Sequence, residues 1–138
     1  MSVLEYGRPI TLDEARQVMA AAEAEAQQQQ WAMVIAVVDS SGHLVALHKM
    51  DHAQYGSIEV AQAKAQTSVN FKRATKVFED AVVAGGMGTR LLSMQTLCPL
   101  EGGLPLFRNG KIVGAIGVSG AQSTQDAQVA AAGARAFQ

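Results

Sequence analysis

Three histidines and a methionine lie close together in the chain and carry groups that bind metals. His43, His48 and His52 are the only imidazoles, and Met50 stands between the last two. Imidazole nitrogen and thioether sulfur both ligate haem iron. Along a strand and a turn, spacings of five and four residues do not bring three nitrogens around one tetrahedral ion, so we expect no metal site of the zinc type. The other interpretation is that these are ordinary histidines of a solvated hairpin.

A second set of candidate positions is rich in glycine. A missing Cβ lets either a flat ligand or another segment of backbone lie directly against a sheet. Both ligand contact and close helix packing fit this pattern, and the amides that open the following helix suit a ligand carboxylate. The positions are Gly102, Gly103, Gly114, Gly117, Ser119 and Gly120.

Glu101 and Lys64 are the candidates for catalysis. Glu101 could act as a general base, or it could anchor a turn by accepting hydrogen bonds from backbone amides. Cys98 precedes a proline with no histidine near it in sequence, which favours a buried structural thiol over a nucleophile. The glycines at 85–88 lack the Gly-Lys-Ser/Thr ending of a phosphate-binding loop. Whether any reaction is catalysed stays open.

Composition limits the classes of partner. With 138 residues, the chain suits one domain spanning 1–138. The net charge of −1 and the absence of a Lys/Arg cluster argue against nucleic acid, and a charged fraction of only 17% favours a homo-oligomer. No apolar run approaches the roughly 18–20 residues of a membrane span. A single cysteine fits a reducing compartment, so we expect a cytoplasmic protein without a membrane partner.

The apolar and turn residues predict the order helix, hairpin, helical middle, hairpin, helix. Consecutive hairpins imply antiparallel pairing, so the expected fold class is α+β, a mostly antiparallel sheet with helices against it. Thr11 and Ser57 are the expected helix caps, and Asn109-Gly110 is typical of a type I′ turn. The expected elements are a helix from Thr11, strands at 33–38 and 43–50, helical segments over 57–82 and 89–94, strands around 104–108 and 111–119, and a helix from Ser123.

The chain resembles the GlcG/HbpS-like family, which includes the C-terminal domain of PduO-type proteins. The resemblance rests on Glu101-Gly102-Gly103-Leu104-Pro105, the Asn109-Gly110 turn and the segment 113–120 that follows. Further similar stretches are 35–39 with 42–46, and 50–51 leading into 56–65. Together they cover nearly the whole chain.

The resemblance implies a profilin-like fold, with a five-stranded antiparallel sheet flanked by helices, assembled into dimers or larger rings up to octamers. It also implies binding of a small molecule, haem or a related tetrapyrrole, for which His43, His48, His52 and Met50 are the candidate ligands. The alternative it leaves open is an accessory protein or enzyme acting on a small hydroxy acid or diol, in an operon for glycolate, glycerol or diol use. Glu101 and Lys64 would then act beside the glycines.

Overall fold

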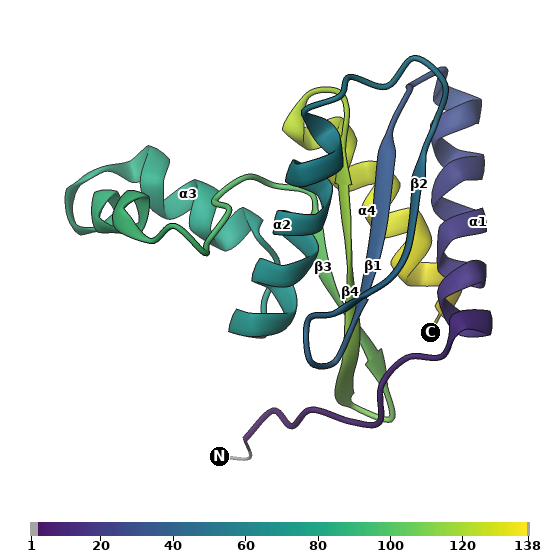
Figure 1. Cartoon of the computed structure of the whole chain (residues 1–138). Coiled ribbons are helices and arrows are strands. Elements are labelled where there is room, and N and C mark those ends of the chain that lie inside the picture. Colours follow the sequence, from purple (N-terminus) through teal and green to yellow (C-terminus); the bar gives the residue numbers. More distant parts are fainter. Residues whose placement is uncertain (1–2, 138) are drawn as a thin grey trace.

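The computed structural model describes residues 3–137 and places four strands in a single sheet (Figure 1). These are β1 (Val34–Asp39), β2 (Leu44–Lys49), β3 (Gly103–Arg108) and β4 (Lys111–Ser119), in the order β2-β1-β4-β3. Each neighbouring pair is antiparallel. The two hairpins are therefore joined by the pairing of β1 with β4, and the α+β class is confirmed.

The expectation of five strands is wrong for the part of the chain that the structure describes. The nearest approach to a fifth strand is the N-terminal segment, where Tyr6 forms a single parallel bridge with Ile112. Gly7 donates to the Ile112 carbonyl at 2.7 Å, but Pro9 follows and has no amide hydrogen to extend the ladder. The regular ladder is broken there, although Ile10 still donates to the Val113 carbonyl at 2.9 Å before the chain turns into the first helix. The profilin-like designation stays a prediction.

Helices cover both faces of the sheet. Helix α2 (Ser57–Phe71) packs on one face, and helices α1 (Leu12–Gln29) and α4 (Ser123–Phe137) pack side by side on the other (Figure 1). The continuous apolar run of β1 serves both layers, since alternate side chains point to opposite faces. Ile35 and Val37 join the α1–α4 core, and the α2 side takes Val34, Ala36 and Val38.

Two of the local signals act as expected and one does not. Thr11 and Glu14 form a capping box at α1, with the Glu14 amide donating to Thr11 Oγ1 at 3.1 Å. Asn109 has a φ of 54°, as the turn between β3 and β4 requires. Ser57 is not a cap, because Gly56 holds that position, and the Ser57 hydroxyl instead accepts from Ser119.

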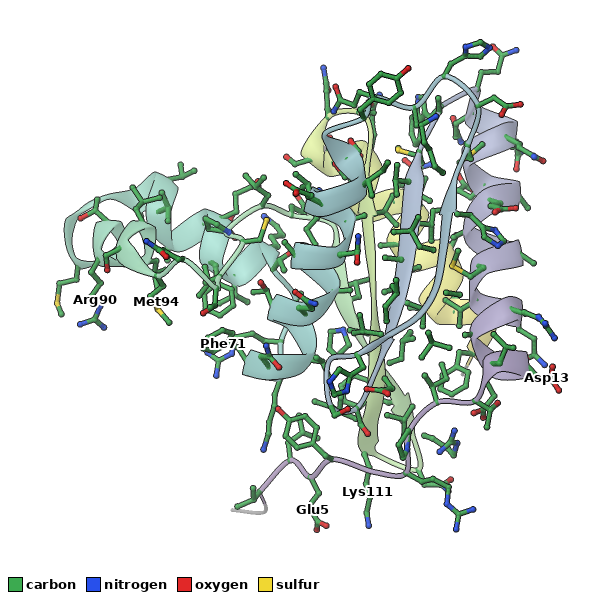
Figure 2. The ribbon with its side chains drawn as sticks, in the orientation of Figure 1. Glu5, Asp13, Phe71, Arg90, Met94 and Lys111 are labelled. Atoms are coloured by element: carbon green, nitrogen blue, oxygen red, sulfur yellow. The ribbon has the colours of Figure 1, made fainter. Side chains whose placement is uncertain are left out.

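An arm made of α3 (Lys76–Ala84) and the 3₁₀ helix η1 (Gly86–Ser93) projects from the body (Figure 1). The two helices pack against each other, and Val83 and Met87 are 80% and 73% exposed. Figure 2 shows Arg90 and Met94 near the outer end of this arm. Among residues 3–137, no helix is both long and apolar enough to cross a membrane.

Candidate ligand site

Helix α1 and strand β2 bring two side chains together, although 25 residues separate them in sequence. His48 Nδ1 makes a hydrogen bond with Glu23 Oε1. A neutral imidazole bonded in this way carries its proton on Nδ1, so that Nε2 keeps a free lone pair. The His48 side chain is 56% exposed, so part of the ring is accessible to solvent.

A hollow of about 570 Å³ opens beside this pair. Its size is within the range of small-molecule sites, and its walls are mostly polar. His48 lines it from the end of β2, and Met50 lines it from the position just after the strand. The lining residues are Glu23, Gln27, Leu47, His48, Lys49, Met50 and Asp51.

A second hollow, of about 410 Å³, follows directly along the chain. It is lined by Lys49, His52, Ala53, Gln54 and Tyr55. Because Lys49 lines both hollows, they are neighbours at one end of β2. His52 has a φ of 71°, in the left-handed region, and its side chain is exposed.

His43 lies at the opposite end of β2. Five residues of extended chain separate it from His48, a span of about 16 Å. Its ring Nδ1 is 2.9 Å from the Ser41 hydroxyl, and its backbone amide donates to Asp39 in the β1–β2 turn. The structure therefore brings His48, Met50 and His52 to one end of the strand and leaves His43 at the other.

The glycine-rich face is occupied by helix α2. A Cβ added to Gly117 would lie 2.0 Å from the Ala61 carbonyl oxygen, and one added to Gly103 would lie 2.5 Å from that of Lys64. Of the two interpretations, close helix packing applies at these positions, and the helix leaves no room there for a flat ligand. Added Cβ atoms at Gly102, Gly114 and Gly120 would also meet backbone oxygens within 3 Å. The Ser119 side chain is buried and donates to Ser57.

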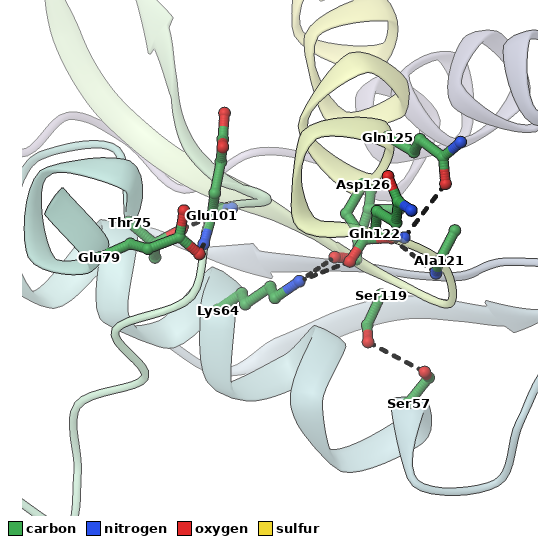
Figure 3. Close-up of polar contacts among 12 residues, drawn as sticks. Ser57, Lys64, Thr75, Glu79, Glu101, Ser119, Ala121, Gln122, Gln125 and Asp126 are labelled. Atoms are coloured by element: carbon green, nitrogen blue, oxygen red, sulfur yellow. Dashed lines mark hydrogen bonds and ion pairs between the residues drawn. The ribbon is translucent and has the colours of Figure 1, made fainter. Parts of the chain in front are cut away.

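Lys64 is committed to a buried ion pair (Figure 3). Its Nζ donates to Asp126 Oδ2 at 2.9 Å and to the Val118 carbonyl at 2.8 Å, and both charged side chains are almost fully buried. Burial raises the pKa of Asp126, while Lys64 opposes that shift. The ammonium group is therefore held by two acceptors and serves to join α2, β4 and α4.

The other candidate base and nucleophile, Glu101 and Cys98, have hydrogen-bond partners of their own. Glu101 lies beside Glu79, whose carboxylate accepts from the Glu101 amide at 3.1 Å (Figure 3). Cys98 is half-buried, and burial raises the pKa of its thiol, which fits a structural role. Within residues 3–137, no three His, Cys, Asp or Glu side chains gather in a way that could hold a metal ion.

Comparison with known proteins decides the family. A family model described as haem degrading protein HbpS-like matches residues 10–135. The chain belongs to this HbpS-like family. Protein GlcG of Escherichia coli strain K12 is 42% identical to it over 105 residues, which cover 76% of this chain and 77% of GlcG. The resemblance found in the sequence is thereby confirmed.

Solved structures of similar proteins share the fold over nearly their whole length. Protein ORFY of Klebsiella pneumoniae has a TM-score of 0.87 and 32% identity, covering 99% of this chain and 96% of ORFY. The structure of the PduOC:Heme complex has a TM-score of 0.84 and 30% identity, covering 93% and 94%. Haem is thus bound by a protein similar to this HbpS-like chain.

Sequence reasoning missed Glu23 as the partner of His48 and Asp126 as the partner of Lys64. A signal for the second was present, because Lys64 falls on the same helical stripe as the buried Ala61 and Ala65 of this HbpS-like domain. A lysine at such a position needs a buried counter-charge. No comparable signal marks Glu23, which shares the polar side of α1 with Asp13 and Gln27.

Proposed function

We propose that this chain binds haem or a related tetrapyrrole in the hollow beside the exposed end of β2, with His48 as the iron ligand. Two findings support haem as the ligand class. The family model is one of haem-degrading HbpS-like proteins, and a similar protein of 30% identity forms a haem complex.

The single observation that carries the choice of His48 is its hydrogen bond to Glu23. Histidines that ligate metals usually donate their other ring N–H to a carboxylate, which fixes the tautomer and raises the basicity of the ligating nitrogen. Here the carboxylate holds Nδ1 of a residue that lines the hollow, so Nε2 is the ring nitrogen left for the iron. His43 has no carboxylate on its ring, because its Nδ1 meets the Ser41 hydroxyl instead.

The donor set around His48 fits the group. Met50 lines the same hollow and offers a thioether to iron, and His52 lines the adjoining one. The ammonium group of Lys49, which lines both, can pair with a propionate carboxylate. Bound haem would supply an iron centre whose chemistry depends on its axial ligands. The part of the protein is to orient the imidazole and to hold the propionates.

Titration of the purified protein with haemin, followed by the Soret band, tests this function. We expect saturable binding to the parent protein and at least tenfold weaker binding to His48→Gln. His43→Gln is the matched control, since it removes an exposed imidazole from the other end of the same strand. Absence of a saturable Soret change, or an equal loss in both variants, would contradict the proposal.

Glu23→Gln tests the role of the carboxylate separately. Loss of such an outer partner typically weakens metal binding about 10- to 100-fold, so we expect at least a tenfold loss of haemin affinity. Glu25→Gln is the control, because Glu25 lies on the same helix and bonds Gln29 and Gln128 rather than a histidine. Equal haemin affinities of the two variants would show that Glu23 has no specific part in haemin binding.

We also propose that the chain self-associates through the arm. The arm exposes a group of large apolar side chains that a second copy could cover, namely Val77, Val83, Met87, Leu92 and Met94. Light scattering should give a mass above 14.5 kDa, and Val83→Glu should lower it. A monomeric parent protein would contradict this.

A cytoplasmic location stays a prediction, to be checked by cell fractionation.

A further inference from the structure

A separate hollow lies at the opposite end of the molecule from the His48 site. It has a volume of about 440 Å³ and is enclosed by the N-terminal segment, the start of α1 and the β3–β4 turn. Figure 2 shows Lys111 and Glu5 at this end of the sheet, away from the arm that carries Arg90. The lining residues are Gly7, Arg8, Thr11, Glu14, Arg108, Asn109, Lys111 and Val113.

The charge of this hollow is opposite in sign to that of the whole chain. Arg8, Arg108 and Lys111 contribute three positive charges and Glu14 one negative charge, which leaves +2. The chain as a whole has a net charge of −1. A concave surface with a net excess of one sign of charge attracts ions of the other sign.

The three cations differ in how firmly they are held. Arg108 is anchored, since its guanidinium bonds the Glu14 carboxylate and donates to the Arg8 carbonyl at 3.1 Å. Lys111 has only an exposed contact of 3.6 Å with Glu5. The Arg8 guanidinium has no carboxylate within salt-bridge distance in the described part of the chain. Arg8 and Lys111 are therefore available to a ligand beside a fixed third cation.

We propose that this hollow is a binding site for a small organic anion carrying a phosphate or two carboxylates. Guanidinium groups bind both through paired charge-assisted hydrogen bonds, and an ammonium adds a point charge. The aliphatic stems of the cationic side chains provide apolar wall for a carbon skeleton. Among residues 3–137, no His, Met, Cys or Tyr lines this hollow, and it shares no lining residue with the proposed haem site.

Isothermal titration calorimetry with inorganic phosphate and with succinate tests the site and separates the two anion types. We expect saturable binding of at least one of them, weakened at least fivefold by Arg8→Gln and by Lys111→Gln. Both residues are exposed, so these variants should fold normally. Arg90→Gln removes one positive charge from the arm and should change the affinity less than twofold. 1,4-Butanediol, the uncharged analogue of succinate, should not bind.

Glu14→Gln gives a result of opposite sign. Glutamine still accepts a hydrogen bond at the third position of a capping box, so α1 keeps its cap. The one negative charge among the described lining residues disappears. We expect two- to fivefold tighter anion binding. The proposal is overturned if neither phosphate nor succinate binds saturably, if Arg90→Gln weakens binding as much as Arg8→Gln, or if Glu14→Gln leaves the affinity unchanged. His48→Gln should not affect anion binding at this site. Failure of the anion-site proposal and failure of the haem-site proposal can therefore be told apart.

Discussion

Replacement of Asp126 by asparagine should strongly destabilise the fold, because it leaves the ammonium group of Lys64 buried without its counter-charge. Lys64 Nζ lies 2.9 Å from Asp126 Oδ2, and the two side chains are only 2% and 4% exposed. Asparagine keeps the size of the side chain and one carbonyl oxygen. Because the Ala121 amide donates to Asp126 Oδ1 at 3.0 Å, the asparagine NH2 group must face either this amide or Lys64. The change therefore removes the negative charge together with one hydrogen-bond acceptor.

The expected magnitude follows from this burial. Removing one partner of a buried ion pair typically costs about 3–5 kcal/mol. The bond from Lys64 to the Val118 carbonyl, at 2.8 Å, survives the change and places the expected loss near the lower bound. A domain of this size unfolds with a free energy of about 5–15 kcal/mol, so a loss of about 3 kcal/mol should be plain in urea denaturation.

A double-mutant cycle in urea separates the ion pair from other effects of each substitution. Lys64→Met combined with Asp126→Asn removes both charges, so the double variant should be less destabilised than the sum of the two single variants. Two results would contradict the role of this ion pair. One is a free energy of unfolding for Asp126→Asn within about 1 kcal/mol of the parent value, and the other is additivity of the two substitutions.

The pH dependence of the Lys64→Met variant has a definite sign. Burial raises the pKa of Asp126, and loss of Lys64 removes the main opposing effect, so the pKa of this carboxyl should rise further. A group whose pKa is raised by folding favours the folded state at low pH, and this advantage disappears as the pH rises through the folded-state pKa. The variant should therefore gain stability relative to the parent from about pH 8 to about pH 5. A relative loss would contradict this.

Three further predictions concern stability and are measured by urea denaturation. Thr11→Ala removes the α1 cap and should cost about 1 kcal/mol; no change would mean that the cap hydrogen bond is dispensable. Gly117→Ala would place a Cβ 2.0 Å from a backbone oxygen of α2 and should lower the free energy of unfolding by at least about 2 kcal/mol. Gly56 has open space around it, so Gly56→Ala should change this free energy by less than about 0.5 kcal/mol. Similar effects at the two glycines would refute the close-packing argument. The hydrogen bond from the Thr11 amide lowers the pKa of Glu14; burial opposes this shift and Arg108 adds to it. Glu14 therefore stabilises the fold above its ordinary pKa. This contribution is lost as the pH falls through the lowered pKa. The stability difference between the parent and Glu14→Gln should accordingly shrink from about pH 6 to about pH 3, and a constant difference would contradict it.

The features predicted correctly from sequence are those with local causes. The Asn109-Gly110 turn depends on residues that tolerate positive φ, and the burial of β1 on both faces follows from its uninterrupted apolar run. The cap at Ser57 failed because a hydroxyl near a helix start has other partners in three dimensions, and here Ser119 takes it.

The parts of the site that could not be predicted depend on distant segments. The pairing of Glu23 with His48 joins residues 25 apart, and that of Lys64 with Asp126 joins residues 62 apart. The histidines are close in sequence but not all close in space, because an extended strand separates His43 from His48. The glycine-rich face allowed a ligand or a helix, and only the path of α2 decides between them.

A crystal structure of the protein with haemin bound is the most direct measurement of the central claim. We expect the iron at His48 Nε2, with Nδ1 still held by Glu23 and the macrocycle in the hollow beside β2. Iron ligated from another face of the molecule, with His48 and Glu23 still paired and free of ligand, would contradict it.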